Sequence, residues 1–149
     1  GRQFVDKMRF TDNIDLLKKL LAQADEFVKI LGSGKDFPRN NFLDIEGSLK
    51  KAAIEGSFLF EEELYDLKRA LTTLARCLSF FQEDEKNEFP ELKQISGAVT
   101  FNPQLLKEIE KVIDERGVIR DNASPTLSQI RRRIGQEEEN LRRKLDQIL

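Results

Sequence analysis

The short motif most suggestive of chemistry is a glycine-rich stretch that ends in a lysine, Gly32-Ser33-Gly34-Lys35. Backbone N–H groups of such a loop can hold phosphates when the glycines and the lysine have P-loop spacing after a strand. That spacing requires glycine and a hydroxyl residue where this chain has Lys29 and Asp36. The stretch also follows a segment of helical periodicity. We therefore expect the C-terminal turn of a helix here, not a nucleotide site.

Residues for nucleophilic catalysis and transition-metal binding are scarce. The chain has no histidine, which removes the commonest general base, Ser-His and Cys-His pairs, and the usual zinc sites. Its one cysteine, Cys77, lies beside an apolar helical stripe and is predicted to be a small core residue. A lone cysteine cannot form an internal disulfide, which fits a reducing cytoplasm. No catalytic, cofactor-binding or metal-binding residue is predicted.

Carboxylates are plentiful, but their spacing favours solvated helix faces. The clusters are runs of neighbouring residues, whose side chains point in different directions on a helix and do not converge on a substrate. They lie at Glu61 to Glu63, Glu83 to Glu85 and Glu137 to Glu139. Asp114 and Asp121 bracket Gly117 without the spacing of a calcium loop, so a role in a turn and a cap is predicted for both.

Two basic runs, Arg131 to Arg133 and Arg142 to Lys144, are candidates for phosphate contacts. No aromatic residue is interleaved with them, and the net charge of −2 gives no global attraction to nucleic acid. Acidic residues four positions away favour ion pairs along one helix instead. The predicted pairs are Arg133 with Glu137, Glu138 with Arg142, and Glu139 with Arg143.

Apolar residues recur every three or four positions along most of the chain, which predicts an all-α fold. The expected helices begin at a cap on Thr11 or Asp12, span about Asp44 to Glu55, and begin at Glu61, after Pro90 and after Asn102. The stripes expected to be buried in the first two helices are Ile14, Leu17, Leu21, Ala24, Val28, Leu31 and Ile45, Leu49, Ala53. At most a minor β element is expected, near residues 1–10 and 113–120.

A long helix is predicted over about residues 125–149. Ser124 can cap it and Pro125 suits its first position. One apolar stripe follows, and neither glycine cap nor proline ends the run before Leu149. At about 1.5 Å per residue the helix would be a rod of roughly 37 Å. Gly135 weakens its middle.

The length of 149 residues predicts one domain over 1–149, and no apolar run is long enough for a membrane span. Because the chain begins with Gly1 and not with methionine, we expect a segment of a larger cytoplasmic protein.

The segment from Asp114 to Arg132 carries a family resemblance. Its pattern, Asp-x-x-Gly-x-Ile-x-Asp-x-Ala-Ser-Pro-x-Leu-x-x-Ile-Arg-Arg, resembles the segment that leads into the long lever helix of bacterial MutS-like ATPases. It is most similar to the second branch, whose members usually end in an Smr nuclease domain. Residues 44–49 and 55–59 resemble the same family, whereas Gly135 departs from it.

The resemblance implies the N-terminal core and lever region of a DNA-repair or recombination ATPase. The lever would link the ATPase to a clamp that engages branched DNA or ribosomes. ATP, magnesium, mismatch-repair activity and endonuclease activity would belong to the parent protein, and the chain itself would catalyse nothing. Expected partners are the clamp, the ATPase, a returning lever helix and a second copy through the last helix. Alternatives are a free-standing adaptor that binds a partner helix, and a nucleic-acid module that uses the arginines.

Overall fold

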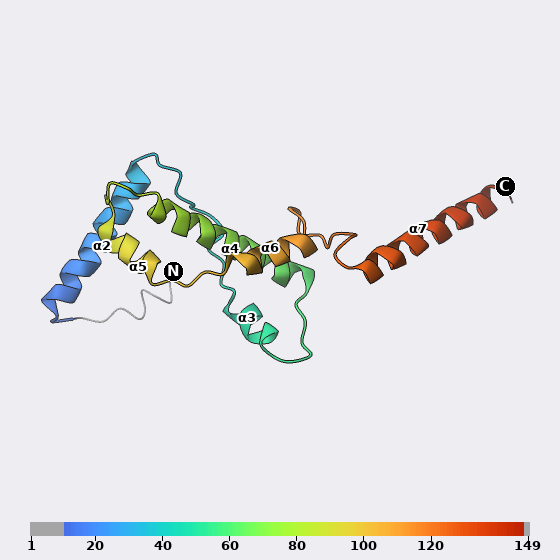
Figure 1. Ribbon diagram of the computed structural model, residues 1–149, viewed down its shortest axis with the longest axis horizontal. Coiled ribbons are helices and arrows are strands. Elements are labelled where there is room, and N and C mark those ends of the chain that lie inside the picture. The colour runs from blue at the N-terminus through green and yellow to red at the C-terminus, as the bar shows by residue number, and fades with distance from the viewer. Residues whose placement is uncertain (1–10, 148–149) are drawn as a thin grey trace. The chain divides into compact units, whose positions relative to one another are not determined.

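A computed structural model describes residues 11–147 (Figure 1). This range holds six helices and no strand, so the predicted all-α class is confirmed. One isolated antiparallel bridge, between Ile113 and Ile119, forms inside the predicted β region at 113–120. The strand or arm predicted for residues 1–10 lies outside the described residues. The helices are α2 (Ile14–Gly32), α3 (Glu46–Ala52), α4 (Glu61–Gln82), α5 (Pro90–Gly97), α6 (Pro103–Val112) and α7 (Pro125–Asp146).

The chain divides into two compact units. Unit 1 consists of Gly1–Arg39 and Leu74–Phe101, and unit 2 consists of Asn40–Thr73 and Asn102–Leu149. Helix α4 supplies its C-terminal part to unit 1 and its N-terminal part to unit 2. The single domain expected over 1–149 stays a prediction.

The core of unit 1 is largely aromatic. Its buried residues are Ile30, Phe37, Phe81 and Phe89, and Cys77, Phe80 and Leu92 pack against them. Phe37 meets the rings of Phe80 and Phe81 edge to face. Cys77 therefore packs against the core as predicted, and burial raises the pKa of its thiol, which lowers its thiolate population.

The predicted buried face of α2 is wrong. Its buried residues are Glu26 and Ile30, whereas the predicted stripe is exposed, with Leu17 at 45% and Val28 at 65%. The Glu26 carboxylate accepts hydrogen bonds from the N–H groups of Glu91 (3.1 Å) and Leu92 (2.9 Å) in the first turn of α5. This polar contact sets which face of α2 meets α5, and apolar periodicity cannot reveal it.

The predicted start of α2 is also displaced. The cap is Asn13, not Thr11 or Asp12, and its side chain accepts a hydrogen bond from the N–H of Leu16 at 3.0 Å. Asparagine, aspartate and threonine are all good caps, so composition alone does not choose among neighbours.

Helix α3 is shorter than predicted and is not buried. It has seven residues, Glu46–Ala52, and Asp44 lies before it with its carboxylate accepting from the N–H of Glu46. Of the predicted stripe only Ile45 packs against the core of unit 2, while Leu49 and Ala53 are exposed. Two helical turns are too short for the whole stripe to reach one neighbour.

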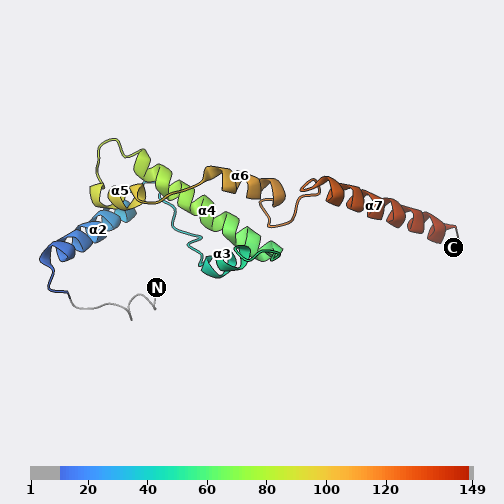
Figure 2. The same ribbon diagram turned by 60° about the horizontal axis from the view of Figure 1, so that its bottom comes forward.

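The core of unit 2 joins the N-terminal part of α4 to α6. Its buried residues are Leu67 from α4, Ile109 from α6, and Ile113 just after α6. Ile45, Leu59, Leu64, Tyr65 and Leu71 pack against this cluster. The connection from α6 to α7, drawn in orange to red in Figure 2, therefore begins at a fully buried residue.

Candidate functional site: the turn at the base of helix α7

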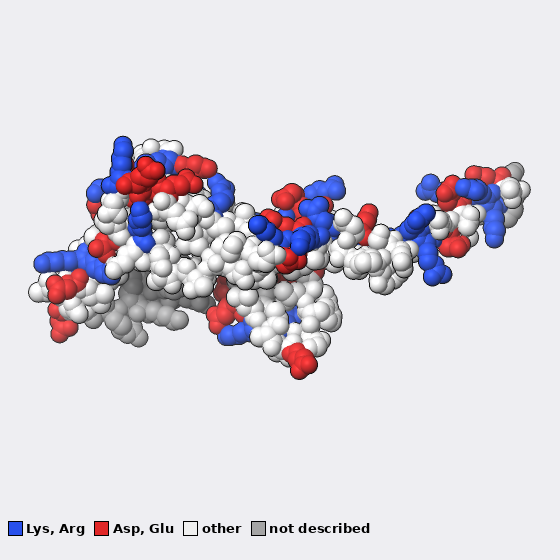
Figure 3. Space-filling model, viewed as in Figure 1, with Lys and Arg blue, Asp and Glu red and all other residues white. Residues whose placement is uncertain are grey.

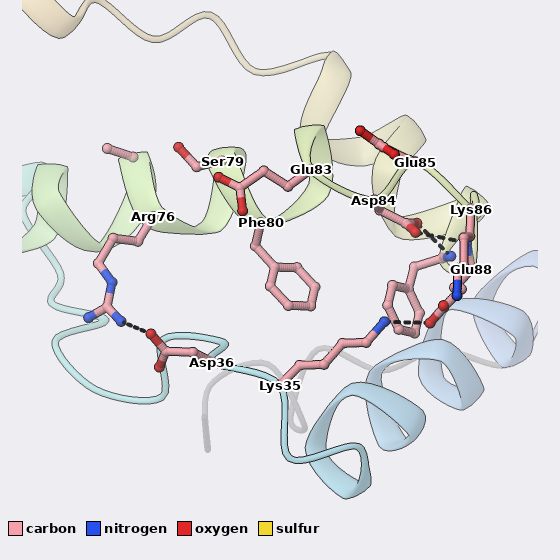
Figure 4. Close-up of a pocket in the computed structure, with 12 residues that line it drawn as sticks. Lys35, Asp36, Arg76, Ser79, Phe80, Glu83, Asp84, Glu85, Lys86 and Glu88 are labelled. Atoms are coloured by element: carbon pink, nitrogen blue, oxygen red, sulfur yellow. Dashed lines mark hydrogen bonds and ion pairs between the residues drawn. The ribbon is translucent and has the colours of Figure 1, made fainter.

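A pocket of about 770 Å³ lies in unit 1, and four of its charged side chains form two ion pairs (Figure 4). Lys35 pairs with Glu88, and Arg76 pairs with Asp36 at 3.0 Å. Lys35 also lies over the Phe89 ring, 4.8 Å from its centroid. The first pair holds the loop between α4 and α5, and the second joins α4 to the segment after α2.

The glycine-rich stretch at this pocket is the end of a helix, as predicted. Helix α2 ends at Gly32, and the Ser33 hydroxyl donates a hydrogen bond to the carbonyl of Ile30 at 2.8 Å. Gly34 has a φ of 70°, a left-handed conformation that glycine adopts without strain. A phosphate site would need these backbone N–H groups at the start of a helix, not at its end.

One acidic cluster is less solvated than predicted. Asp84, in the middle of Glu83 to Glu85, is buried, and its carboxylate accepts from the N–H groups of Glu88 and Phe89, each at 3.1 Å. Burial opposes ionisation of Asp84, but these hydrogen bonds together with the charges of Lys93 and Lys35 lower its pKa. The carboxylate stabilises the loop before α5. Sequence spacing does not distinguish a buried carboxylate that accepts main-chain hydrogen bonds from one on a solvent-exposed helix face.

The other clusters behave largely as expected. In Glu61 to Glu63, at the first turn of α4, the Glu63 carboxylate accepts from Lys51 at 2.6 Å and from the N–H of Phe60 at 2.7 Å, and both bonds lower its pKa. Glu137 to Glu139 are exposed. Within residues 11–147, no group of three or more histidine, cysteine, aspartate or glutamate side chains could hold a metal ion.

The best-organised polar structure of unit 2 is the segment 113–119, here called the base turn. The Asp114 carboxylate accepts from the N–H groups of Arg116 (2.8 Å) and Val118 (2.9 Å). The bond from Val118 makes the largest contribution to lowering the pKa of Asp114. Gly117 has a φ of 83° at the tip. The predicted turn role of Asp114 is therefore confirmed.

Helix α4 bonds to the base turn through three side chains, of which Glu61 accepts a hydrogen bond from the N–H of Ile119 at 3.4 Å. The Tyr65 hydroxyl donates to the carbonyl of Glu115 at 2.9 Å, and the buried Lys68 ammonium donates to the carbonyl of Asp114 at 3.1 Å. Lys68 also pairs with the Glu115 carboxylate at 2.9 Å. A Cβ at Gly117 would lie 2.9 Å from the Tyr65 ring, so the backbone approaches the ring as closely as glycine allows. The base turn is thus bonded to helix α4 and joined to the core of unit 2 through Ile113.

Helix α7 begins where the sequence predicts. Ser124 is extended and caps the helix, because its hydroxyl accepts a hydrogen bond from the N–H of Leu127 at 3.1 Å. Pro125 occupies the first position. The bounds Pro125–Asp146 match the predicted start, and the predicted extension to Leu149 lies partly outside the described residues.

Arg131 has a role that sequence reasoning missed. Its guanidinium donates to the carbonyl of Ile119 at 3.1 Å and pairs with Asp121. Asp121 is thereby a partner of Arg131, not the predicted cap. The signal was available: long helical side chains point toward the helix N-terminus, so Arg131 can reach the segment before Ser124.

The rest of α7 presents both charge and apolar surface to solvent. The helix has no buried residue in the part that the structure describes, and Ile134 and Leu145 are 52% and 60% exposed. Blue and red side chains mix along it in Figure 3. Of the three predicted ion pairs, only Glu139 with Arg143 is formed between described residues. An i,i+4 pair is weak at an exposed site, so side-chain entropy readily opposes it.

Comparison with known proteins gives a consistent result. The chain is 30% identical over 149 residues to endonuclease MutS2 of Pelotomaculum thermopropionicum, and 29% identical over 151 residues to endonuclease MutS2 of Geobacillus. Both alignments cover all of this chain and 19% of the relative, so the chain spans about a fifth of these curated proteins. Endonuclease MutS2 of Halalkalibacterium halodurans is 28% identical over 99% of the chain. No family model and no solved structure matches.

The chain is therefore homologous throughout to a segment of MutS2-type proteins, which confirms the resemblance carried by Asp114 to Arg132. The segment that carries this pattern is the base turn, the Ser124 cap and the first turns of α7. None of the helices described is long and apolar enough to cross a membrane.

Proposed function

We propose that this chain, homologous throughout to a segment of the MutS2 endonucleases, is a core and lever segment of a larger ATPase. In this proposal the base turn holds one end of α7 and α7 carries movement away from it. The chain would link the ATPase to a clamp that engages branched DNA or ribosomes. ATP and magnesium binding, and endonuclease activity, would reside in other parts of the parent, and the chain itself would catalyse no reaction.

The observation that carries the proposal is the contrast at the start of α7. The base turn is bonded to α4 through Tyr65 and Lys68 and continues from the fully buried Ile113. The helix that follows has no buried residue among those described. A stiff element with one fixed end converts a small rotation at that end into a larger displacement at the other. This arrangement supports a mechanical role.

The coding sequence gives the first test. We expect a Walker motif in the same reading frame, downstream of this segment. If none is encoded, the chain is not part of an ATPase and the proposal fails.

The purified chain gives the second test. Incubated with ATP, magnesium and branched DNA, it should show neither ATP hydrolysis nor DNA cleavage. Turnover that co-purifies with the chain and disappears on a point substitution would contradict the non-catalytic role.

A free-standing adaptor that binds a partner helix is the second candidate. It is favoured by the exposed apolar residues of α7, which include Ile130 at 49% and Leu141 at 60%. An open reading frame that ends soon after this segment, together with capture of an amphipathic helical peptide by α7, would support the adaptor over the lever.

Nucleic-acid binding by the arginine runs is the third possibility to be tested. Arg131 is engaged within the chain, and the net charge of −2 opposes binding to phosphates. We expect weak binding that falls steeply with salt. Tight binding at physiological salt that is lost in Arg132→Ala and Arg133→Ala would favour a nucleic-acid module.

A further inference from the structure

We infer that Arg131 fixes the direction of α7 relative to the base turn. From here on, the word clamp means these contacts of Arg131 and not the part of the parent that would engage DNA or ribosomes. The inference deepens the proposed function and rests on it, because the direction of α7 gains significance if α7 transmits movement. The clamp itself is a property of this chain and can be measured without the parent protein.

The clamp joins the helix to a part of the chain that cannot move freely. Arg131 donates to the carbonyl of Ile119, and Ile119 is bridged to Ile113. Ile113 has no exposed surface and belongs to the core of unit 2. The bridge is formed by hydrogen bonds from the N–H of Arg120 to the carbonyl of Val112 (2.8 Å) and from the N–H of Asp114 to the carbonyl of Val118 (3.0 Å). Arg131 thus connects the second turn of α7 to a segment that is bonded to that core.

Without Arg131, the helix would be joined to the base turn mainly through the main chain. Residues 120–124 form a turn in which the N–H of Ala123 donates to the carbonyl of Arg120 at 3.0 Å. Among residues 126–147, Arg131 is the one side chain that forms a hydrogen bond or ion pair outside the helix and its cap. No residue of α7 in that range is buried.

The two partners of Arg131 differ in how they respond to salt. Asp121 is exposed, with 83% of its side-chain surface accessible, so added salt screens this ion pair. The bond to the Ile119 carbonyl also uses the charged guanidinium, but its acceptor is a main-chain group held by the bridge. High salt should thus loosen the clamp partially, whereas removal of Arg131 should release it.

The experiment measures distances within unit 2 of the 149-residue chain. Spin labels are placed on cysteines at the exposed positions Glu62 and Gln136, in a Cys77→Ala background, and the distance distribution is recorded by pulsed electron paramagnetic resonance. We expect one narrow distribution in the wild type. In Arg131→Ala the ratio of released to clamped populations should rise roughly three- to tenfold, as expected for losing one charged hydrogen bond at a half-exposed site.

The neighbouring arginines supply the matched controls. Arg132→Ala and Arg133→Ala remove the same charge from exposed positions and should leave the distribution unchanged. Asp121→Asn should broaden it less than Arg131→Ala, because the bond to the Ile119 carbonyl remains. Circular dichroism checks that each variant keeps the helix content of the wild type.

The clamp inference would be wrong if Arg131→Ala left the distance distribution unchanged, or if Arg132→Ala broadened it as much as Arg131→Ala. The lever proposal fails by a different result. If labels at the same positions of the full-length parent show no distance change with ATP, while the clamp variants behave as expected in this chain, the lever is refuted and the clamp stands.

Discussion

Helices α4 and α7 are each 22 residues long, yet they have opposite environments. Helix α4 buries Leu67, Lys68, Thr73 and Phe81. Helix α7 also carries an apolar stripe, interrupted at Glu138, and has no buried residue among those described. Apolar spacing of three and four therefore predicts that both segments are helical, but it does not predict which stripe is covered.

The difference lies in what the flanking segments supply. The N-terminal part of α4 receives residues from α6 and from the base turn, which place apolar side chains and hydrogen-bond partners on it. Beyond its cap, the described part of α7 receives two polar contacts, both through Arg131. Stability in unit 2 should thus depend on the base turn, whereas substitutions along α7 should have small effects.

The sharpest test of this contrast is Gly117→Ala. Gly117 has a φ of 83°, and a Cβ added at this position would lie 2.9 Å from the Tyr65 ring. We expect the free energy of unfolding to fall by about 2–4 kcal/mol, from backbone strain plus displacement of the ring. Urea unfolding followed by circular dichroism measures the loss.

Gly56→Ala is the matched control in the same unit. Gly56 has a φ of 77°, but nothing lies within 4 Å of its added Cβ. Gly56→Ala should lower the free energy of unfolding through backbone strain alone, by about 1–2 kcal/mol. Equal losses at Gly56 and Gly117 would show that Tyr65 does not restrain the base turn.

The next largest effect should come from Lys68→Met. This substitution keeps the apolar stem of a buried side chain but leaves the carbonyl of Asp114 without its Lys68 donor. We expect a loss of about 1–3 kcal/mol in the free energy of unfolding.

Lys50→Met tests whether charge removal alone explains such a loss. Lys50 is exposed and forms an i,i+4 pair with Glu46. Its substitution should change stability by less than about 0.5 kcal/mol. A Lys68→Met protein as stable as Lys50→Met would mean that the base turn is not held by Lys68.

A smaller effect is expected where α7 begins. Ser124→Ala removes the cap that accepts from the N–H of Leu127 and should cost about 0.5–2 kcal/mol. Thermal melting followed by circular dichroism measures it. Ser128→Ala, four residues further along α7 and exposed, should cost nothing. If the two variants melt alike, the helix begins elsewhere.

Residue patterns in the sequence predicted where helices begin better than they predicted which side chains contact one another. Ser124-Pro125 predicted the start of α7 because capping is chemistry within four residues of sequence. The buried face of α2 could not be predicted, since it is set by hydrogen bonds from Glu26 to residues 91 and 92. Arg131 was missed for a related reason. The helical spacing of four offers Arg131 no acidic partner, and its partners Ile119 and Asp121 precede the helix.

Acid should weaken the base turn. The pKa of Asp114 is lowered in the folded chain by hydrogen bonds from Val118 and Arg116. Its stabilising contribution is therefore complete above the unfolded pKa of about 3.9 and is lost as the pH falls through the lower folded value. Urea unfolding repeated across this acidic range measures the slope. Asp114→Asn should have a shallower slope, and an identical slope would exclude Asp114 as its source.

The smallest change should appear at Gly135, and its sign is opposite. Gly135 lies inside α7, and nothing lies within 4 Å of its added Cβ, so Gly135→Ala adds helix propensity without a clash. The gain is about 1 kcal/mol in local helix stability. Because no described residue of α7 is buried, this gain should slow hydrogen exchange of residues 136–147 while leaving the base turn unchanged.

Dilution then separates an exposed helix from a self-associating one. In wild type, protection of residues 136–147 that rises with protein concentration means that the apolar stripe pairs with another copy, and low protection at all concentrations means fraying. Strong protection that does not depend on concentration would contradict the contrast with α4. The stripe would then be covered within its own chain, α7 would be part of the core, and Gly135→Ala would have little left to stabilise.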